Sequence, residues 1–205
     1  LAGRQFSRAT AHVLGAQNSA GLAIQRVDLL QHGVNEFHDI ARNTSLGSVE
    51  KAQRAMQVIE SICDPELTGL ASQVTSALID GKDTPDFTFT LADDLDKDRL
   101  RARDMLFSGQ ADQAIEAAEA AVAHLDQVYA AGHGVPRYFN SYAERVVYNR
   151  LFATLDERTV LIPDNLFYAH MELADVLSQI KGAEAAIPHL NRMVAYAPAY
   201  PLSHL

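Results

Sequence analysis

Five side chains suited to binding a partner recur at helical spacing in the segment 137–155. They are Tyr138, Tyr142, Arg145, Asn149 and Phe152, at i, i+4, i+7, i+11 and i+14. A continuous helix would align them along one side. Tyr and Arg bury a large area while keeping a polar group for hydrogen bonds, so they are common anchors of binding surfaces. The spacing predicts a partner-contacting ridge. The alternative is that the tyrosines pack inside the protein with their hydroxyls at the surface.

The histidines and aspartates do not have the spacing of a metal site. The eight histidines are His12, His32, His38, His124, His133, His170, His189 and His204, and neither His-Glu-x-x-His nor Glu-x-x-His occurs. Asp94-x-Asp96-x-Asp98 resembles the start of a calcium-binding loop. However, Arg99 stands where that loop needs Gly, and Met105 where it needs Glu. We therefore predict no metal and no other cofactor, and interpret the aspartates as an acidic helix start.

No motif of nucleophilic or phosphate chemistry is present. The sequence has no G-x-S-x-G, P-loop or G-x-G-x-x-G. Cys63, the only cysteine, excludes an intrachain disulfide and fits a reducing cytosol. It follows the apolar run 58–62 without a catalytic partner beside it, so we interpret it as a small core residue. We predict no catalytic residues and a cytoplasmic location.

The composition limits the classes of partner. Apolar residues make up 48% of the chain and charged residues 21%, as in globular proteins, and the net charge is −9. A nucleic-acid surface needs a basic stripe, so this charge argues against one. No window of 18 apolar residues occurs, so we predict no membrane span in this sequence. Because the chain starts with Leu1 and ends where another helix is expected, we expect a longer protein.

The elements that position these residues are predicted to be helices. Apolar periodicity predicts helices over 5–24, with a bend near Gly15 or Gly21, and over 25–42, 49–63, 66–81, 95–108, 112–130, 137–155, 166–180 and 183–197. An acidic loop, 82–94, separates an N-terminal helical region, 1–81, from a C-terminal helical domain, 95–205. The prediction is an all-α fold of eight or nine helices.

The loop 82–94 contains a short alternating stretch. Phe87-Thr88-Phe89-Thr90-Leu91 alternates apolar and polar residues, as a half-buried strand does. One interpretation is an extended loop held to the helices by its apolar side chains. The other is a two-stranded ribbon formed with 159–162, the only other run of this type.

A repeat pattern occupies residues 166–205. His170-x2-Leu173-Ala174-x2-Leu177 is followed by Ala186-x3-Leu190 and Pro198. These spacings resemble the tetratricopeptide repeat, W-x2-L-G-x2-Y…A-x3-F…P, with aliphatic residues replacing the aromatic ones. Residues 95–128 hold a weaker copy, with Ala102, Met105, Gly109 and Ala114 in matching places. It departs from the family pattern at Arg101, Ala118 and Asp126.

The resemblance implies a right-handed α–α superhelix that binds proteins or peptides and has no catalytic residues. The two copies start 72 residues apart, so we expect a degenerate repeat containing the helix 137–155 between them. A truncated array leaves apolar surface at its end, which favours self-association, for example as a homodimer. We therefore predict a non-enzymatic scaffold, and in one variant of this prediction it is the sensing or dimerising portion of a larger regulator. The alternative is an enzyme or a small-ligand binder with a cleft beside the loop 82–94.

The resemblance also indicates which residues face the partner. In this family the first helix of each pair lines the concave surface. The corresponding residues are Arg99 and Arg103 in the weaker copy, and Tyr168, Met171 and Asp175, with Ser178, in the last copy. The two arginines would suit an acidic peptide, or would pair with the aspartates at 94, 96 and 98.

Overall fold

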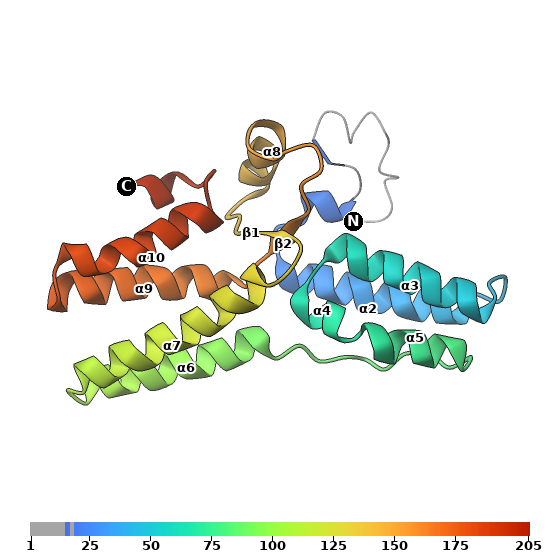
Figure 1. Cartoon of the computed structure of the whole chain (residues 1–205), viewed down its shortest axis with the longest axis horizontal. Helices are drawn as coiled ribbons and strands as arrows, with labels where there is room; N and C mark the ends of the chain where they lie inside the picture. The colour runs from blue at the N-terminus through green and yellow to red at the C-terminus, as the bar shows by residue number, and fades with distance from the viewer. Residues whose placement is uncertain (1–14, 17–18) are drawn as a thin grey trace.

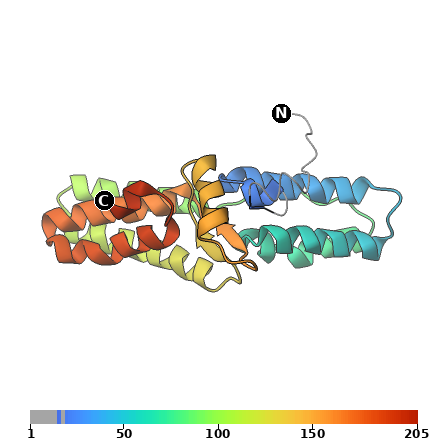
Figure 2. The same ribbon diagram turned by 90° about the horizontal axis from the view of Figure 1, so that it is seen from above.

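The computed structural model describes residues 15–16 and 19–205, which form an elongated molecule with a helical lobe at each end (Figures 1 and 2). This part of the chain contains nine α-helices, two short 3-10 helices and two strands, which confirms the all-α class. Of the predicted helix 5–24, residues 5–14 and 17–18 lie outside the described residues, and Ser19–Leu22 form a 3-10 helix, η1. None of the described helices combines the length and apolarity needed to cross a bilayer. The right-handed superhelix stays a prediction.

The N-terminal lobe is built from α2 (Arg26–Arg42), α3 (Ser48–Ile62), α4 (Pro65–Gly69) and α5 (Ala71–Ile79). Their apolar stripes meet in one cluster around Phe37, Ile59 and Leu78. The predicted helix 66–81 is two helices that meet at Leu70, directly after Gly69, a residue type that weakens helices. Cys63 ends α3 in the left-handed conformation and is half-buried, so the prediction of a core position holds only in part.

A buried charge cluster joins this lobe to the rest of the chain. The guanidinium of Arg26 donates to both carboxylate oxygens of Asp64, at 2.7 and 3.1 Å, and to Glu66 at 2.6 Å. Asp64 also caps α4, because it accepts from the backbone N–H groups of residues 66 and 67. Glu66 accepts from the N–H groups of Thr90 and Leu91 at 2.9 and 3.1 Å. One arginine thereby connects α2, α4 and the start of α6.

The acidic loop is shorter than predicted, since α6 (Leu91–Phe107) begins at residue 91 and the predicted boundary of 94 is wrong. Asp93 and Asp94 lie in its first turn, where acids interact favourably with the helix dipole. Phe87 and Phe89 are partly buried against the N-terminal cluster. The extended-loop interpretation is therefore confirmed, and the ribbon between 87–91 and 159–162 is wrong.

The C-terminal lobe consists of two helical hairpins. The first is α6 with α7 (Ala111–Ala130), and the second is α9 (Asp164–Ile180) with α10 (Ala183–Tyr196), followed by η2 (Pro201–His204). Their turns contain Gly109 and Gly182, whose φ angles of +78° and +95° favour glycine. Helix α9 contacts both α6 and α7. The hairpins therefore stack directly on each other, and the predicted degenerate repeat between them is wrong.

The segment between the hairpins leaves the stack. It forms β1 (Val135–Arg137), α8 (Tyr142–Leu151) and β2 (Thr159–Leu161), and the strands pair in parallel with Val135 opposite Thr159. The predicted helix 137–155 is wrong at both ends. The N–H of Tyr138 donates to the carbonyl of Tyr196 at 2.7 Å, which holds this residue in extended structure. Helix α8 begins only after Ser141, whose hydroxyl accepts from the N–H of Glu144.

The same segment connects the two apolar clusters. Tyr138 belongs to the C-terminal cluster, where its ring stacks on Phe167 with centroids 4.4 Å apart. The next residue, Phe139, belongs to the N-terminal cluster and contacts the ring of Tyr148. We conclude that residues 131–163 join the lobes and do not extend the repeat array.

Gly134 permits the close approach of β1 and β2. A Cβ atom at this position would lie 2.0 Å from Cγ2 of Val160 and 3.0 Å from the carbonyl oxygen of Arg158. We expect Gly134→Ala to lower the free energy of unfolding by about 1–3 kcal/mol, the usual cost of overpacking. Urea denaturation followed by circular dichroism measures this. Gly132→Ala is the control, because its Cβ would meet only Tyr129 O at 3.5 Å. Equal loss in both variants would contradict this packing.

Candidate functional site

A groove lies between the two hairpins of the C-terminal lobe, enclosed by α6, α7 and α9. Its volume is about 580 Å³. The larger apolar side chains that line it are Leu95, Leu100, Leu106, Phe107, Ile115, Val122, Leu173 and Val176. Between them lie alanines from all three helices, including Ala114, Ala118 and Ala121 of α7. Because alanine carries only a methyl group, these positions leave space that longer side chains would fill.

Two apolar side chains at the groove are exposed to solvent. Leu100 is 50% exposed and Phe107 is 82% exposed. Exposed apolar residues are unremarkable singly, but a set that lines one groove often marks a binding site. The groove could therefore bury apolar side chains of another molecule.

Charged side chains also line this groove. Arg99 of α6 donates to Glu172 of α9 at 2.5 and 3.2 Å, and to Asp96 at 2.8 Å. Burial lowers the pKa of Arg99, but its hydrogen bonds to the two carboxylates outweigh burial and the pKa is raised. Arg103, one turn further along, is exposed and makes no ion pair within the described part of the chain. Arg99 is thus engaged within the protein, whereas Arg103 is available to a partner.

The residues predicted on the repeats divide into two groups. Arg99 and Arg103 both line the groove, and their contact with a partner stays a prediction. Tyr168 instead shares a hydrogen bond with the hydroxyl of Tyr138 at 3.1 Å, and Met171 packs against the C-terminal core. Asp175 is exposed and accepts from Gln179 on its own helix. These three residues are not among the groove-lining side chains.

Helix α9 reaches the groove through a stripe that the sequence analysis missed. Its lining residues are Ala169, Glu172, Leu173 and Val176. They follow i, i+3, i+4 and i+7, the spacing of one helix face. This spacing of small and apolar residues was present in the sequence, but the resemblance to tetratricopeptide repeats favoured the helix face that begins at Tyr168.

The predicted ridge over 137–155 is not formed. Tyr138 lies before α8 and packs inside the protein, as the alternative interpretation has it, but its hydroxyl contacts that of Tyr168. Tyr142 is exposed. Arg145 is only 4% exposed, and its Nε donates to the carbonyl of Gly21 at 2.8 Å. Asn149 donates to the same carbonyl at 2.9 Å. These two side chains fasten α8 to η1 and do not form a surface with Tyr142.

The surroundings of Arg145 are unusual for a cation. Its guanidinium lies over the ring of Phe139, 4.7 Å from the centroid, and burial lowers its pKa to about 10. This contact supports a packing role. Phe152, the last residue of the predicted ridge, follows α8 and is half-exposed.

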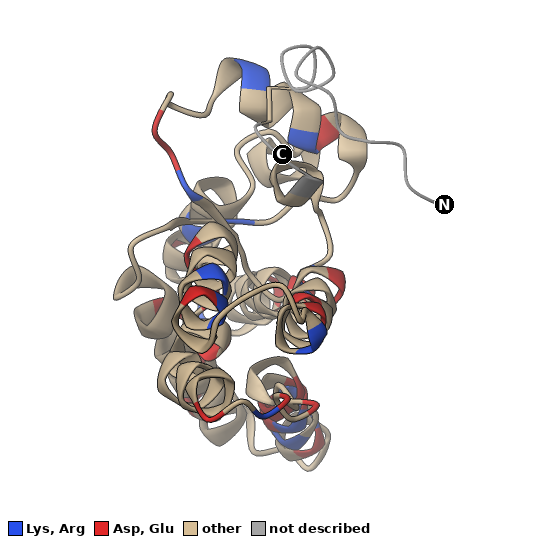
Figure 3. Cartoon of the chain, turned by 90° about the vertical axis from the view of Figure 1, so that its right-hand side faces the viewer, with Lys and Arg blue, Asp and Glu red and all other residues tan. Residues whose placement is uncertain are grey.

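Figure 3 shows one end of the molecule with basic and acidic residues coloured. The two kinds are interspersed on the described helices and form no basic stripe there. Among the described residues, no group of three or more His, Cys, Asp or Glu side chains is arranged to hold a metal ion. Compared with protein-family models, curated proteins and solved structures, the chain matches none of them. The resemblance to tetratricopeptide repeats therefore remains an interpretation of its spacings.

Proposed function

We propose that this protein is a non-enzymatic scaffold that binds a protein or peptide partner in the groove between the hairpins α6–α7 and α9–α10. The observation that carries the proposal is the apolar lining of that groove, with Leu100 and Phe107 exposed beside it. The direct stacking of two hairpins with tetratricopeptide-like spacing supports it, because stacked hairpins create extended binding surfaces.

The groove suggests the chemistry of the partner. Its apolar lining suits one or two aliphatic or aromatic side chains of an amphipathic helix or an extended peptide. Arg103 can pair with a carboxylate next to those side chains, whereas Arg99 already pairs with Glu172. We therefore propose an apolar anchor flanked by an acidic residue.

Site-specific photo-crosslinking in the producing cell tests this proposal. A benzophenone amino acid would replace Leu100 in the groove or Leu190 on α10, which is similarly exposed, 45% against 50%, but does not line the groove. We expect one or a few defined products from position 100, identified by mass spectrometry, that position 190 does not give.

Each outcome of this experiment has a clear meaning. A heterologous product confined to position 100 supports the scaffold. A crosslinked homodimer would show that the groove is a self-association surface instead. Equal yields at both positions would reject the groove as the binding site.

A further inference from the structure

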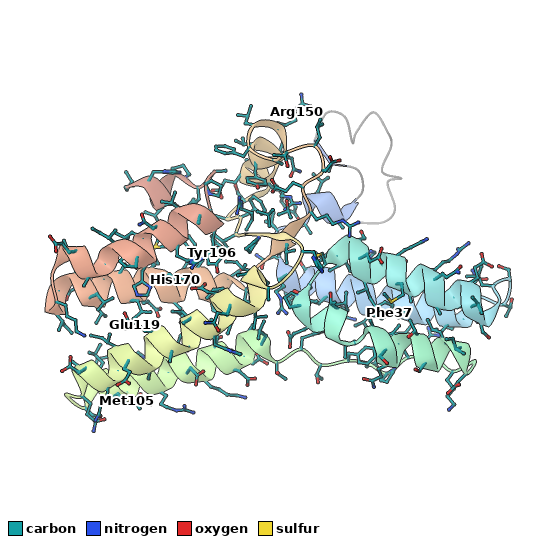
Figure 4. The ribbon with its side chains drawn as sticks, in the orientation of Figure 1. Phe37, Met105, Glu119, Arg150, His170 and Tyr196 are labelled. Carbon is teal, nitrogen blue, oxygen red and sulfur yellow. The ribbon has the colours of Figure 1, made fainter. Side chains whose placement is uncertain are left out.

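Four hydrogen-bonded polar side chains, all but one of them largely buried, connect the second hairpin with the first. His170 of α9 lies between Asp126 of α7 and His189 of α10: its Nε2 is 3.1 Å from Asp126 Oδ1, and its Nδ1 is 2.9 Å from Nδ1 of His189. The Nε2 of His189 is 3.3 Å from Oε1 of Glu119, also on α7. His170 is 2% exposed and His189 9% exposed. Figure 4 shows Glu119, His170 and Tyr196 where α7 meets the hairpin α9–α10.

The number of protons shared by these four side chains follows from their geometry. Each of the three contacts needs one hydrogen between its two atoms. An ionised carboxylate only accepts, so both Nε2 atoms must carry a proton, and the Nδ1–Nδ1 contact needs a third. Two neutral imidazoles carry two protons between them. With all three contacts formed, the four side chains therefore hold one additional proton. The histidine pair then carries one positive charge between two carboxylates.

The neighbouring groups keep Asp126 ionised. Burial raises the pKa of Asp126, but hydrogen bonds from His170 and from the hydroxyl of Tyr196 outweigh burial, so this pKa lies below its usual value. Arg192 of α10 adds a positive charge 3.6 Å from the same carboxylate. Burial raises the pKa values of Tyr196 and of Tyr129 on α7, so both remain neutral phenols. Glu119, whose side chain is half-exposed, is the member that water can reach.

We propose that Glu119, His189, His170 and Asp126 form a proton-dependent clamp, in which one shared proton holds α9–α10 against α7 and its loss at rising pH weakens the hairpin stack. Without that proton one of the three contacts lacks its hydrogen. Either two Nδ1 lone pairs face each other, or an Nε2 lone pair of His189 or His170 faces the carboxylate of Glu119 or Asp126. This inference does not depend on the proposed partner, because it concerns the stability of the lobe itself.

The sign of the pH effect follows from proton linkage. With all three contacts formed, the folded protein holds three protons on its two imidazoles. In the unfolded chain, histidines have the usual pKa of about 6.5, so above that pH the same two imidazoles carry two protons. The folded state then binds more protons than the unfolded state, so stability falls as the pH rises. A difference of one pKa unit between the folded and the unfolded state changes the unfolding constant about tenfold.

The variant Glu119→Gln separates the shared proton from ordinary packing. The Gln amide can donate to Nε2 of His189, so both imidazoles can be neutral with all three contacts satisfied. Glu116→Gln is the control, because Glu116 is exposed on the same helix and forms no ion pair among the described residues. Hydrogen bonds to Asp83 and Asp86 raise the pKa of His38, so His38 also loses stabilisation at rising pH, equally in all three proteins.

Urea unfolding at pH 6.5 and pH 9 gives the first readout. For each protein we compare the factor by which the unfolding constant rises between these pH values. We expect this factor to be about ten times larger for the wild type and Glu116→Gln than for Glu119→Gln. Nitrogen NMR of ¹⁵N-histidine protein at pH 7.5 gives the second. We expect three protonated ring nitrogens for this pair in the wild type and two in Glu119→Gln. Two protonated nitrogens in the wild type, or the same pH response in all three proteins, would overturn the proposal.

Discussion

Replacing Arg26 with Met is expected to lower the free energy of unfolding by about 3–5 kcal/mol, the usual cost of breaking a buried ion pair from one side. Arg26 is buried, and so is the Asp64 carboxylate that it contacts at 2.7 Å. Burial lowers the pKa of Arg26, but the hydrogen bonds to Asp64 and Glu66 and the charge of Asp64 raise it by more. Without Arg26, Asp64 would be a buried charge with no cationic partner. Urea denaturation followed by circular dichroism measures the loss.

Two further variants identify the cause of that loss. Arg42→Met removes an exposed ion pair of the same helix, in which Arg42 and Asp83 are 3.5 Å apart. We expect this variant to lower the free energy of unfolding by less than about 1 kcal/mol. In Arg26→Met/Asp64→Asn, Asn can still cap α4 without a buried charge, so part of the stability should return. Equal effects of Arg26→Met and Arg42→Met would show that the cluster is not the connection between α2, α4 and α6 that we describe.

Leu100→Glu is expected to weaken partner binding at least 30-fold, about 2 kcal/mol, the loss typical of a central interface residue. The new carboxylate would enter the apolar groove and lose solvation whenever a partner fills it. Because Leu100 is half-exposed, the fold should tolerate the change. Titration calorimetry with the partner captured from position 100 measures the affinity.

Leu190→Glu is the matched control for this prediction. It places the same charge on α10 at a similarly exposed position that does not line the groove. We expect its affinity to stay within about threefold of the wild type. A comparable loss in both variants would indicate a general effect of negative charge.

The two hairpins of the C-terminal lobe could be predicted from sequence because their signals are local. Apolar residues at three- and four-residue spacing, with Gly109 and Gly182 at the turns, define each helix pair. How the pairs stack could not be predicted in the same way. The 72-residue interval was interpreted as one further repeat, whereas residues 131–163 leave the stack and α9 packs directly on α6 and α7.

The segment 135–161 was mispredicted because its structure depends on distant partners. A strand of three residues, Val-Pro-Arg, has almost no local signal, and it forms by pairing with β2 more than twenty residues later. The bond from Tyr138 N–H to Tyr196 O is likewise non-local. Apolar periodicity extends through such residues regardless of these contacts, so it predicted one long helix.

The residues predicted on α6 line the groove, but those predicted on α9 do not. Arg99 and Arg103 face the groove, but the stripe from Ala169 to Val176 replaces the predicted residues of α9, since a rotation by one residue selects another helix face. The histidine pair was missed because residues 170 and 189 are far apart in sequence. They meet across the turn at Gly182, and the antiparallel hairpin was the available signal.

The most direct test of the groove is amide hydrogen exchange of the whole protein, free and bound to the partner captured at position 100. We predict slower exchange on binding in α6, α7 and α9, around Leu100, Ile115 and Leu173. We expect little change in α2 to α5. Slower exchange confined to α8 and Tyr142, with none in the helices of the groove, would contradict this prediction.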